Sequence, residues 1–173
     1  MASLQQVLDA LVAEARVAIT DLGHPATVYA GWPTQQNLAE VVAKGIRSHV
    51  SVYALPGERN TTRFPRDPVP RSGGAEIVLL LRQQEKSFMV TVWAAAPDVR
   101  EALAEAIDGL LGTMDRLRLP DFPGRIRYQS TYEEEPQDRL QVFRRSLTYT
   151  VEWATTDATP ATKIVATRFT LDP

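Results

Sequence analysis

The sequence predicts a single-domain α+β protein, residues 1-173, in which a mixed, mainly antiparallel β-sheet is flanked by about three α-helices. Three observations lead to this prediction. The chain has 173 residues, which is a usual length for one domain with one core. Apolar residues recur at helical spacing in three segments and alternate with polar residues in several others. No internal repeat or linker divides the chain, so these elements are expected to share one sheet.

The three predicted helices have recognisable start and stop signals. Ser3 and Gln6 have the spacing of a capping box, Thr34 is a good N-cap, and Pro97 suits a first helical turn. Gly23 and Gly112 are expected to end the first and third helices. The inward stripes are Leu4, Val7, Leu8, Leu11, Val12 and Ala15; Leu38, Val41, Val42 and Ile46; and Val99, Leu103, Ile107, Leu110 and Leu111.

The predicted strands begin with 27–30 and 49–54 on either side of the second helix. A polar turn at 83–86 is expected to join 77–81 and 88–94 as a hairpin. Residues 125–132 are moderately strand-like, and 143–153 give the clearest alternation of the chain. A turn at 155–162 is then expected to lead into a closing strand near 165–171 that pairs with 143–153.

The segment 55–74 is the long loop of this fold prediction, rich in Arg, Pro and Gly. It has four prolines, three glycines and four arginines and almost no apolar residue, which is typical of a loop or arm. Its polar side chains suit contacts with carboxylates or phosphates across an interface, although a solvated loop without a partner explains them equally well. The candidate interface residues here are Arg59, Asn60, Arg63, Arg66 and Arg71.

A second candidate interface joins an acidic run to a basic pair further along the chain. Glu133, Glu134 and Glu135 precede Arg144 and Arg145, and such opposite charges could meet between identical subunits in a ring. A solvated turn between two strands is the simpler explanation. Both readings stay open from the sequence.

Composition and motifs favour no catalytic, cofactor or metal site. The net charge of -2 argues against a protein that coats nucleic acid, and the chain has no cysteine and only two histidines. His49 lies near Ser51, but no G-x-S-x-G elbow or phosphate-binding loop accompanies them. Trp32, Trp93 and Trp153 are expected to pack in the core or on the sheet, and a base-stacking platform is the less favoured alternative.

Two segments resemble small virion proteins of tailed bacteriophages. They are VYAGWPTQQNLAEVVAKGIRSHVSVYALPGERNTTRF and RRSLTYTVEWATTDATPATKI, with the spaced patterns G-W-P, H-V-S-V, R-N-T-T-R and Y-x-V-E-x-A-T. The resemblance is to the tail terminator or tail completion (head-tail joining) family and covers a third to a half of the chain. It implies a non-enzymatic structural protein with an α/β fold that forms a ring, commonly a hexamer, on the end of the tail tube.

The same resemblance implies the partners and the location. The ring would contact further copies of itself, the tail tube protein, a neck or head-completion protein and, in contractile phages, the tail sheath protein. No cofactor, membrane or sequence-specific nucleic acid is implied, although DNA would pass through the ring. Without a signal peptide or an apolar run of membrane-spanning length, the chain is expected to be made in the host cytoplasm and to reside in the virion, at the tail or neck.

Three alternatives remain. One is another neck or minor tail component, such as a head-closure, stopper or baseplate protein. Another is a small hydrolase that uses His49 or the carboxylates between Glu133 and Asp138. The third is a nucleic-acid binder that uses Arg59, Arg63 and Arg66, whose binding would be sensitive to salt.

Overall fold

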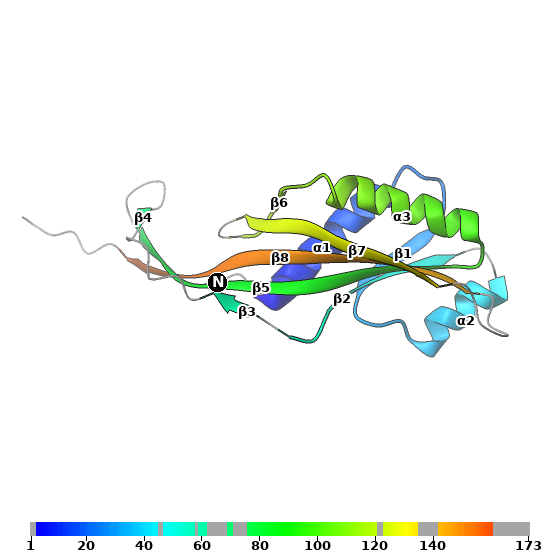
Figure 1. Cartoon of the computed structure of the whole chain (residues 1–173), viewed down its shortest axis with the longest axis horizontal. Helices are drawn as coiled ribbons and strands as arrows, with labels where there is room; N and C mark the ends of the chain where they lie inside the picture. Colours follow the sequence, from blue (N-terminus) through cyan, green and yellow to red (C-terminus); the bar gives the residue numbers. More distant parts are fainter. Residues whose placement is uncertain are drawn as a thin grey trace, which may run out of the picture.

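A single β-sheet organises the chain and carries helices on both faces (Figure 1). The computed structural model describes residues 3–44, 47–57, 59–61, 69–70, 76–120, 123–134 and 142–160. Within these ranges the sheet has eight strands in the order β1-β2-β5-β8-β7-β6, and β3 and β4 pair with β5 beyond the end of β2. All pairs are antiparallel except β1 with β2, which confirms the predicted mixed, mainly antiparallel α+β fold.

The elements of the described residues follow one another in an order close to the predicted one. They are α1 (Leu4–Ile19), β1 (Ala26–Ala30), α2 (Gln35–Lys44), β2 (Ser48–Ala54), β3 (Arg59–Thr61), β4 (Val69–Pro70), β5 (Glu76–Ala94), α3 (Pro97–Leu111), β6 (Arg116–Leu117), β7 (Gly124–Glu134) and β8 (Phe143–Pro160).

Most helix signals of the sequence act as predicted, but two do not. α1 ends at Ile19 with Thr20 as its C-cap, so Gly23 does not cap it, and Leu4 of its predicted inward stripe is 39% exposed. Ser3 and Gln6 form the capping box, in which the Ser3 hydroxyl accepts from the Gln6 amide and Gln6 Oε1 accepts from the Ser3 amide. Thr34 Oγ1 accepts from the amide of Asn37 at the start of α2. Pro97 lies in the first turn of α3, and Gly112 is its C-cap. These local bonds satisfy backbone groups that a helix end otherwise leaves unpaired.

The predicted hairpin at 83–86 is wrong, because β5 runs without a turn from Glu76 to Ala94. Strand β8 pairs with β5 over this whole length, with one irregularity between Leu80 and Arg82. The polar residues that suggested a turn lie where the strand leaves the helical layer, so the sheet does not require apolar side chains there. One long strand therefore replaces two short ones.

Strand β8 also extends further than the sequence predicts. It continues to Pro160, so most of the turn expected at 155–162 is strand. The closing strand expected near 165–171 lies outside the described residues. The long loop at 55–74 is not entirely irregular either, because β3 and β4 fall within it and pair with β5.

The core lies between α1, α3 and one face of the sheet. α1 and α3 pack on each other, and the buried cluster joins residues such as Leu11 and Leu103 to Val52, Phe88 and Tyr149 of the strands. On the opposite face, α2 contacts β2 and β5 and buries Val41 completely. The helices thus cover the part of the sheet in which β1, β2, β5 and β8 lie side by side.

The other half of the two longest strands projects from this body as an arm. We use the term arm for β3, β4, residues 76–85 of β5 and residues 152–160 of β8. Figure 1 shows it extending past the helices, at the end of the sheet away from α2. The fold consequently presents a compact end with helices and a narrow end made of strands.

Candidate interaction surface

The acidic run and the basic pair predicted from sequence face each other across β7 and β8. Glu133 lies opposite Arg145 and Glu134 opposite Arg144 in the strand register. Arg145 Nε is 3.5 Å from Glu133 Oε1, and Arg144 Nη2 forms an ion pair with Glu134 Oε2. These charges are therefore paired within one chain. Their predicted role between subunits stays a prediction.

Arg145 also binds the helical layer, a contact that sequence reasoning missed. Its guanidinium forms an ion pair with Glu101 of α3, and the same carboxylate accepts from Arg100 Nε at 2.7 Å. Burial favours the neutral acid, but the hydrogen bonds and charges of Arg100 and Arg145 outweigh it and hold the pKa of Glu101 below its ordinary value. This network fixes the first turns of α3 to β8 in the middle of the sheet.

Two arginines of this region lie over aromatic rings. Arg100, which is only 4% exposed, places its guanidinium carbon 5.8 Å from the centre of the Phe143 ring. The guanidinium carbon of Arg144 lies 5.4 Å from the centre of the Trp93 ring. Both distances suit a cation–π contact, which adds about 0.5–1 kcal/mol at an exposed site. The arginines are thus held by packing as well as by charge.

Arg59 lies far from this network, on the arm. It is exposed on β3 opposite Glu85, whereas Arg144 lies opposite Trp93. Eight residues of β5 separate these positions, which corresponds to about 27 Å at 3.4 Å per residue. The backbone of Asn60 pairs with Gln84. Arg63, Arg66, Arg71 and Glu135 lie outside the described residues. The structure therefore brings the described candidates together in two groups instead of one.

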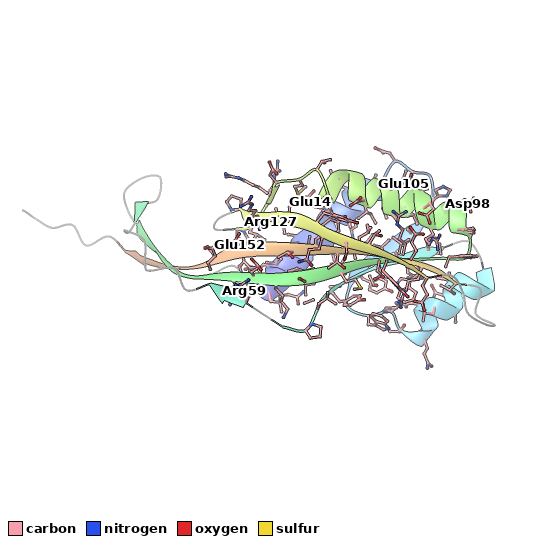
Figure 2. All side chains as sticks on the ribbon, viewed as in Figure 1. Glu14, Arg59, Asp98, Glu105, Arg127 and Glu152 are labelled. Atoms are coloured by element: carbon pink, nitrogen blue, oxygen red, sulfur yellow. The ribbon has the colours of Figure 1, made fainter. Side chains whose placement is uncertain are left out.

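Near the arm, a further ion pair crosses from β7 to β8. Arg127 Nη2 is 3.4 Å from Glu152 Oε2, and Gln83 of β5 also donates a hydrogen bond to Glu152 Oε1. Figure 2 shows Arg127 and Glu152 on neighbouring strands at the start of the arm, with Arg59 on the other side of β5. The base of the arm is consequently a charged surface with both signs.

An aromatic cluster on the α2 side of the sheet contains two of the three tryptophans that were expected to pack in the core or on the sheet. Trp93 and Trp153 are 7% and 3% exposed, as predicted, but Trp32 is 55% exposed. The Trp32 ring is edge-on to Tyr53 at 4.9 Å and to Trp93 at 5.6 Å between ring centres. Tryptophans of this kind, held by neighbours and open to solvent, are typical centres of protein interfaces.

His49 lies under α2 and shows no catalytic arrangement with Ser51. Ser51 Oγ accepts from Trp93 Nε1 at 3.0 Å, while both ring nitrogens of His49 are buried and find no hydrogen-bond partner within the described part of the chain. Glu40 Oε2 lies 3.9 Å from His49 Nε2. Burial is the largest cause that lowers the pKa of His49, with the Glu40 charge opposing it. Among the described residues, no three His, Cys, Asp or Glu side chains cluster as metal ligands would.

A shallow groove borders the outer edge of β1. Its volume is about 440 Å³, and it is lined by Arg16, Ile19 and Thr20 of α1 and its end and by residues 24–28. Arg16 Nη2 donates a hydrogen bond of 2.9 Å to the carbonyl of Val28, so the end of α1 covers part of this edge. The groove contains no cluster of ionisable side chains that would suggest catalysis.

Comparisons with known proteins give similar solved structures but no sequence match. No protein-family model matches the chain, and no curated protein matches its sequence. A solved structure described as "Virion of native gene transfer agent (GTA) particle" contains a chain that is similar in fold, with 16% identity and a TM-score of 0.49. The match covers 89% of this chain and 96% of that one. A similarity of this size carries no inference about function.

Of the helices in the described ranges, not one combines the length and the apolar character needed to cross a bilayer. The candidate interaction surface consists of the paired charges at the β7–β8 end, the aromatic cluster around Trp32 and the arm.

Proposed function

We propose that this chain is a structural protein of a phage-type virion, a tail terminator or tail completion subunit. In this proposal, single-domain subunits form a hexameric ring that caps the tail tube and joins it to the neck. Its partners are further copies of itself, the tail tube protein and a neck protein. In a contractile tail, the last layer of sheath protein is an additional partner.

The observation that carries the proposal is where the two resembling segments lie in the fold. The first, residues 28–64, includes the end of β1 and all of α2, β2 and β3, and the second, residues 144–164, includes most of β8. Strands β2 and β3 pair with one edge of β5, and β8 pairs with the other edge. The resemblance therefore belongs to one continuous surface around β5 and not to scattered elements.

The shape of the subunit supports a role in assembly. The arm extends β5 and β8 past the helices, and strands without helical cover offer backbone and side chains to a neighbour. Arg59 is exposed on this arm, and Trp32 is exposed on the body. We propose that the arm and the arginines of the loop, Arg59, Arg63, Arg66 and Arg71, contact the tube or the next subunit.

Position in the particle tests this proposal most directly. Particles assembled without the chain are expected to carry tails of uncontrolled length or tails that do not join heads. Electron microscopy of particles with the labelled chain should place it as a ring at the head-proximal tail end. Labelling at the capsid portal or at the baseplate would assign it to another neck or tail component, and a chain absent from particles would refute the proposal.

A matched pair of variants tests the arm itself. Arg59→Glu reverses a charge on β3, whereas Arg118→Glu reverses an exposed charge in the segment between β6 and β7. We expect Arg59→Glu to weaken binding of the purified protein to tail tubes, and Arg118→Glu to leave it unchanged. Equal effects of the two variants would contradict a specific role of the arm, since they would reflect net charge alone.

A further inference from the structure

Among the residues that the structure describes, no strand pairs with most of the outer edge of β7. β6 pairs only with Gly124 and Arg125, and the Ile126 amide donates to the carbonyl of Asp115. From Arg127 to Glu134, no other strand of the described residues pairs with this edge. Every residue from 127 to 133 is exposed, with Tyr128 at 44% and Tyr132 at 60%. An open edge of this length is a template for another strand.

The protection of this open segment against pairing is limited to a bulge at Gln129 and to charges at its two ends. The segment reads RYQSTYEE, with no proline or lysine, and the five residues 128–132 carry no charge. Edge strands that remain single are usually short, covered or guarded by such residues. Here the charges lie at the ends, with Arg127 at the start and Glu133 and Glu134 at the finish. Two copies in antiparallel orientation would therefore place opposite charges together at both ends.

The bulge in β7 determines how two copies can align. The register with β8 shifts between Tyr128 and Ser130, so Gln129 is an extra residue that lies opposite no residue of β8 in the strand register. When Gln129 is left out on both strands, an antiparallel alignment pairs Arg127 with Glu134, Tyr128 with Glu133 and Ser130 with Tyr132. Thr131 then lies opposite Thr131 of the second copy.

This alignment is consistent with the faces of the sheet. Arg127 lies opposite Thr150 and Glu134 opposite Arg144, which are six residues apart on β8. Because side chains alternate with a period of two, Arg127 and Glu134 point to the same face and can meet across a strand pair. Arg127 would then lie between Glu152 of its own chain, at 3.4 Å, and Glu134 of the second copy.

We propose that the edge from Arg127 to Glu134 is a homodimer interface, in which β7 pairs with β7 of a second copy about a two-fold axis at Thr131. The contact is isologous, so the same strand supplies both halves of it. It extends the sheet across two chains and satisfies the open backbone groups of both. This dimer proposal does not depend on the proposed function.

The other accessible edge of the sheet fits this partner less well. β1 pairs over five residues only, and Arg16 already donates to the Val28 carbonyl on its outer side. Its sequence ATVYA carries no charge that could match Glu133 and Glu134. The β7 edge of a second copy offers both the length and the complementary charges.

Disulfide trapping tests the contact without background, because the chain contains no cysteine. Directly opposed residues of an antiparallel pair have Cα atoms about 4.5–5.5 Å apart, within the range of a disulfide. We expect Thr131→Cys to form covalent dimers under mild oxidation. Thr27→Cys, at an exposed position of β1, should remain monomeric under the same conditions. Reduced Thr131→Cys protein serves as the check that the fold is kept.

The outcomes of trapping separate the possible partners of the edge. No dimer from Thr131→Cys, together with a monomeric sedimentation profile of the unmodified chain, would overturn the proposal. A dimer that forms only when Thr131→Cys is mixed with Thr27→Cys would also overturn it, because it would show head-to-tail pairing of β7 with β1. Dimers of Thr131→Cys alone support the two-fold contact.

A charge exchange provides an independent test of the alignment. Arg127→Glu places like charges at both ends of the interface and should weaken dimerisation about tenfold, since two pairs change sign in each dimer. Adding Glu134→Arg to the same chain restores both pairs and should restore most of the affinity. Sedimentation measures the dimer, and circular dichroism confirms the fold of each variant. A double variant no better than Arg127→Glu would contradict this alignment.

Discussion

The hydroxyl of Tyr149 donates a hydrogen bond of 2.8 Å to Oδ1 of Asp108 and so joins the centre of β8 to α3. Tyr149 is fully buried, and its ring also contacts Tyr128 edge-on at 5.8 Å between ring centres. The bond anchors the helix that covers the core to the strand that continues into the arm.

Removal of this hydroxyl should destabilise the fold without disturbing its packing. Tyr149→Phe keeps the ring and removes the donor, and a hydrogen bond to a charged group contributes about 1.5–3 kcal/mol. We expect the free energy of unfolding to fall by about 1.5 kcal/mol in denaturant titrations, at the lower end of this range. Asp108 is half-buried, so water can hydrate its carboxylate once the tyrosine hydroxyl is removed. Tyr132→Phe, at an exposed tyrosine, is the control and should leave it unchanged.

The same tyrosine predicts a loss of stability at alkaline pH. Burial is the largest cause that raises the pKa of Tyr149, and the hydrogen bond and charge of Asp108 raise it further. The unfolded chain ionises this tyrosine near its ordinary pKa of about 10, whereas the folded chain keeps the proton. Stability should therefore decline as pH rises above about 10, and the decline should be smaller in Tyr149→Phe. Equal slopes in both proteins would contradict this assignment.

The Glu101 network predicts a loss of stability at acidic pH. Its arginines hold the pKa of Glu101 below the ordinary value, so the stabilisation is present above about 4.5 and is lost as pH falls through the folded pKa. Glu101→Gln should cost about 1 kcal/mol at neutral pH, since the Glu101 side chain is 32% exposed and solvent screens part of the attraction. Glu105→Gln, at an exposed position of α3, should leave the free energy of unfolding unchanged.

His49 predicts a second acid-sensitive step at higher pH. Its burial under α2 lowers its pKa, so the unfolded chain binds a proton near pH 6.5 that the folded chain does not yet bind. Stability should fall as pH decreases from about 6.5 towards the folded pKa. Unfolding titrations of His49→Phe should lack this step, and those of His24→Gln, at an exposed position, should retain it.

A substitution at Trp32 can test assembly separately from stability. Because its ring is 55% exposed, Trp32→Ala should lower the free energy of unfolding by less than about 1 kcal/mol. If Trp32 is an interface centre of the proposed ring, the same variant should prevent ring formation in electron micrographs. Val17→Ala, at a position 63% exposed on α1, is the matched control and should assemble normally. Rings formed by Trp32→Ala would exclude this role.

Local signals predicted much of the fold, and long-range pairing caused the errors. The capping box at Ser3 and the proline at Pro97 act within one helical turn, so the sequence contains the complete pattern. The polar residues 83–86 resemble a turn by composition, but β3 and β8 pair with them from both sides and keep the strand extended. Tertiary pairing overrides local preference there.

The candidate surface was predictable only in part for the same reason. Sequence could suggest that Glu133 and Glu134 meet Arg144 and Arg145, but it could not say that the strand register pairs them within one chain. Arg100 and Glu101 belong to α3 and join this group only through tertiary packing. Trp32 follows Gly31, whose φ of 103° directs the chain out of β1 and leaves the ring exposed, and composition gives no sign of this.

The uninterrupted β5 has a mechanical consequence. Its 19 residues span about 60 Å at 3.4 Å per residue, and one covalent strand passes from the arm into the centre of the core. A force on the arm along this strand would load the hydrogen bonds of the β5–β8 ladder in shear, many at once, instead of opening them one by one. The arm would then resist extension and transmit a pull at its tip directly to the packed body.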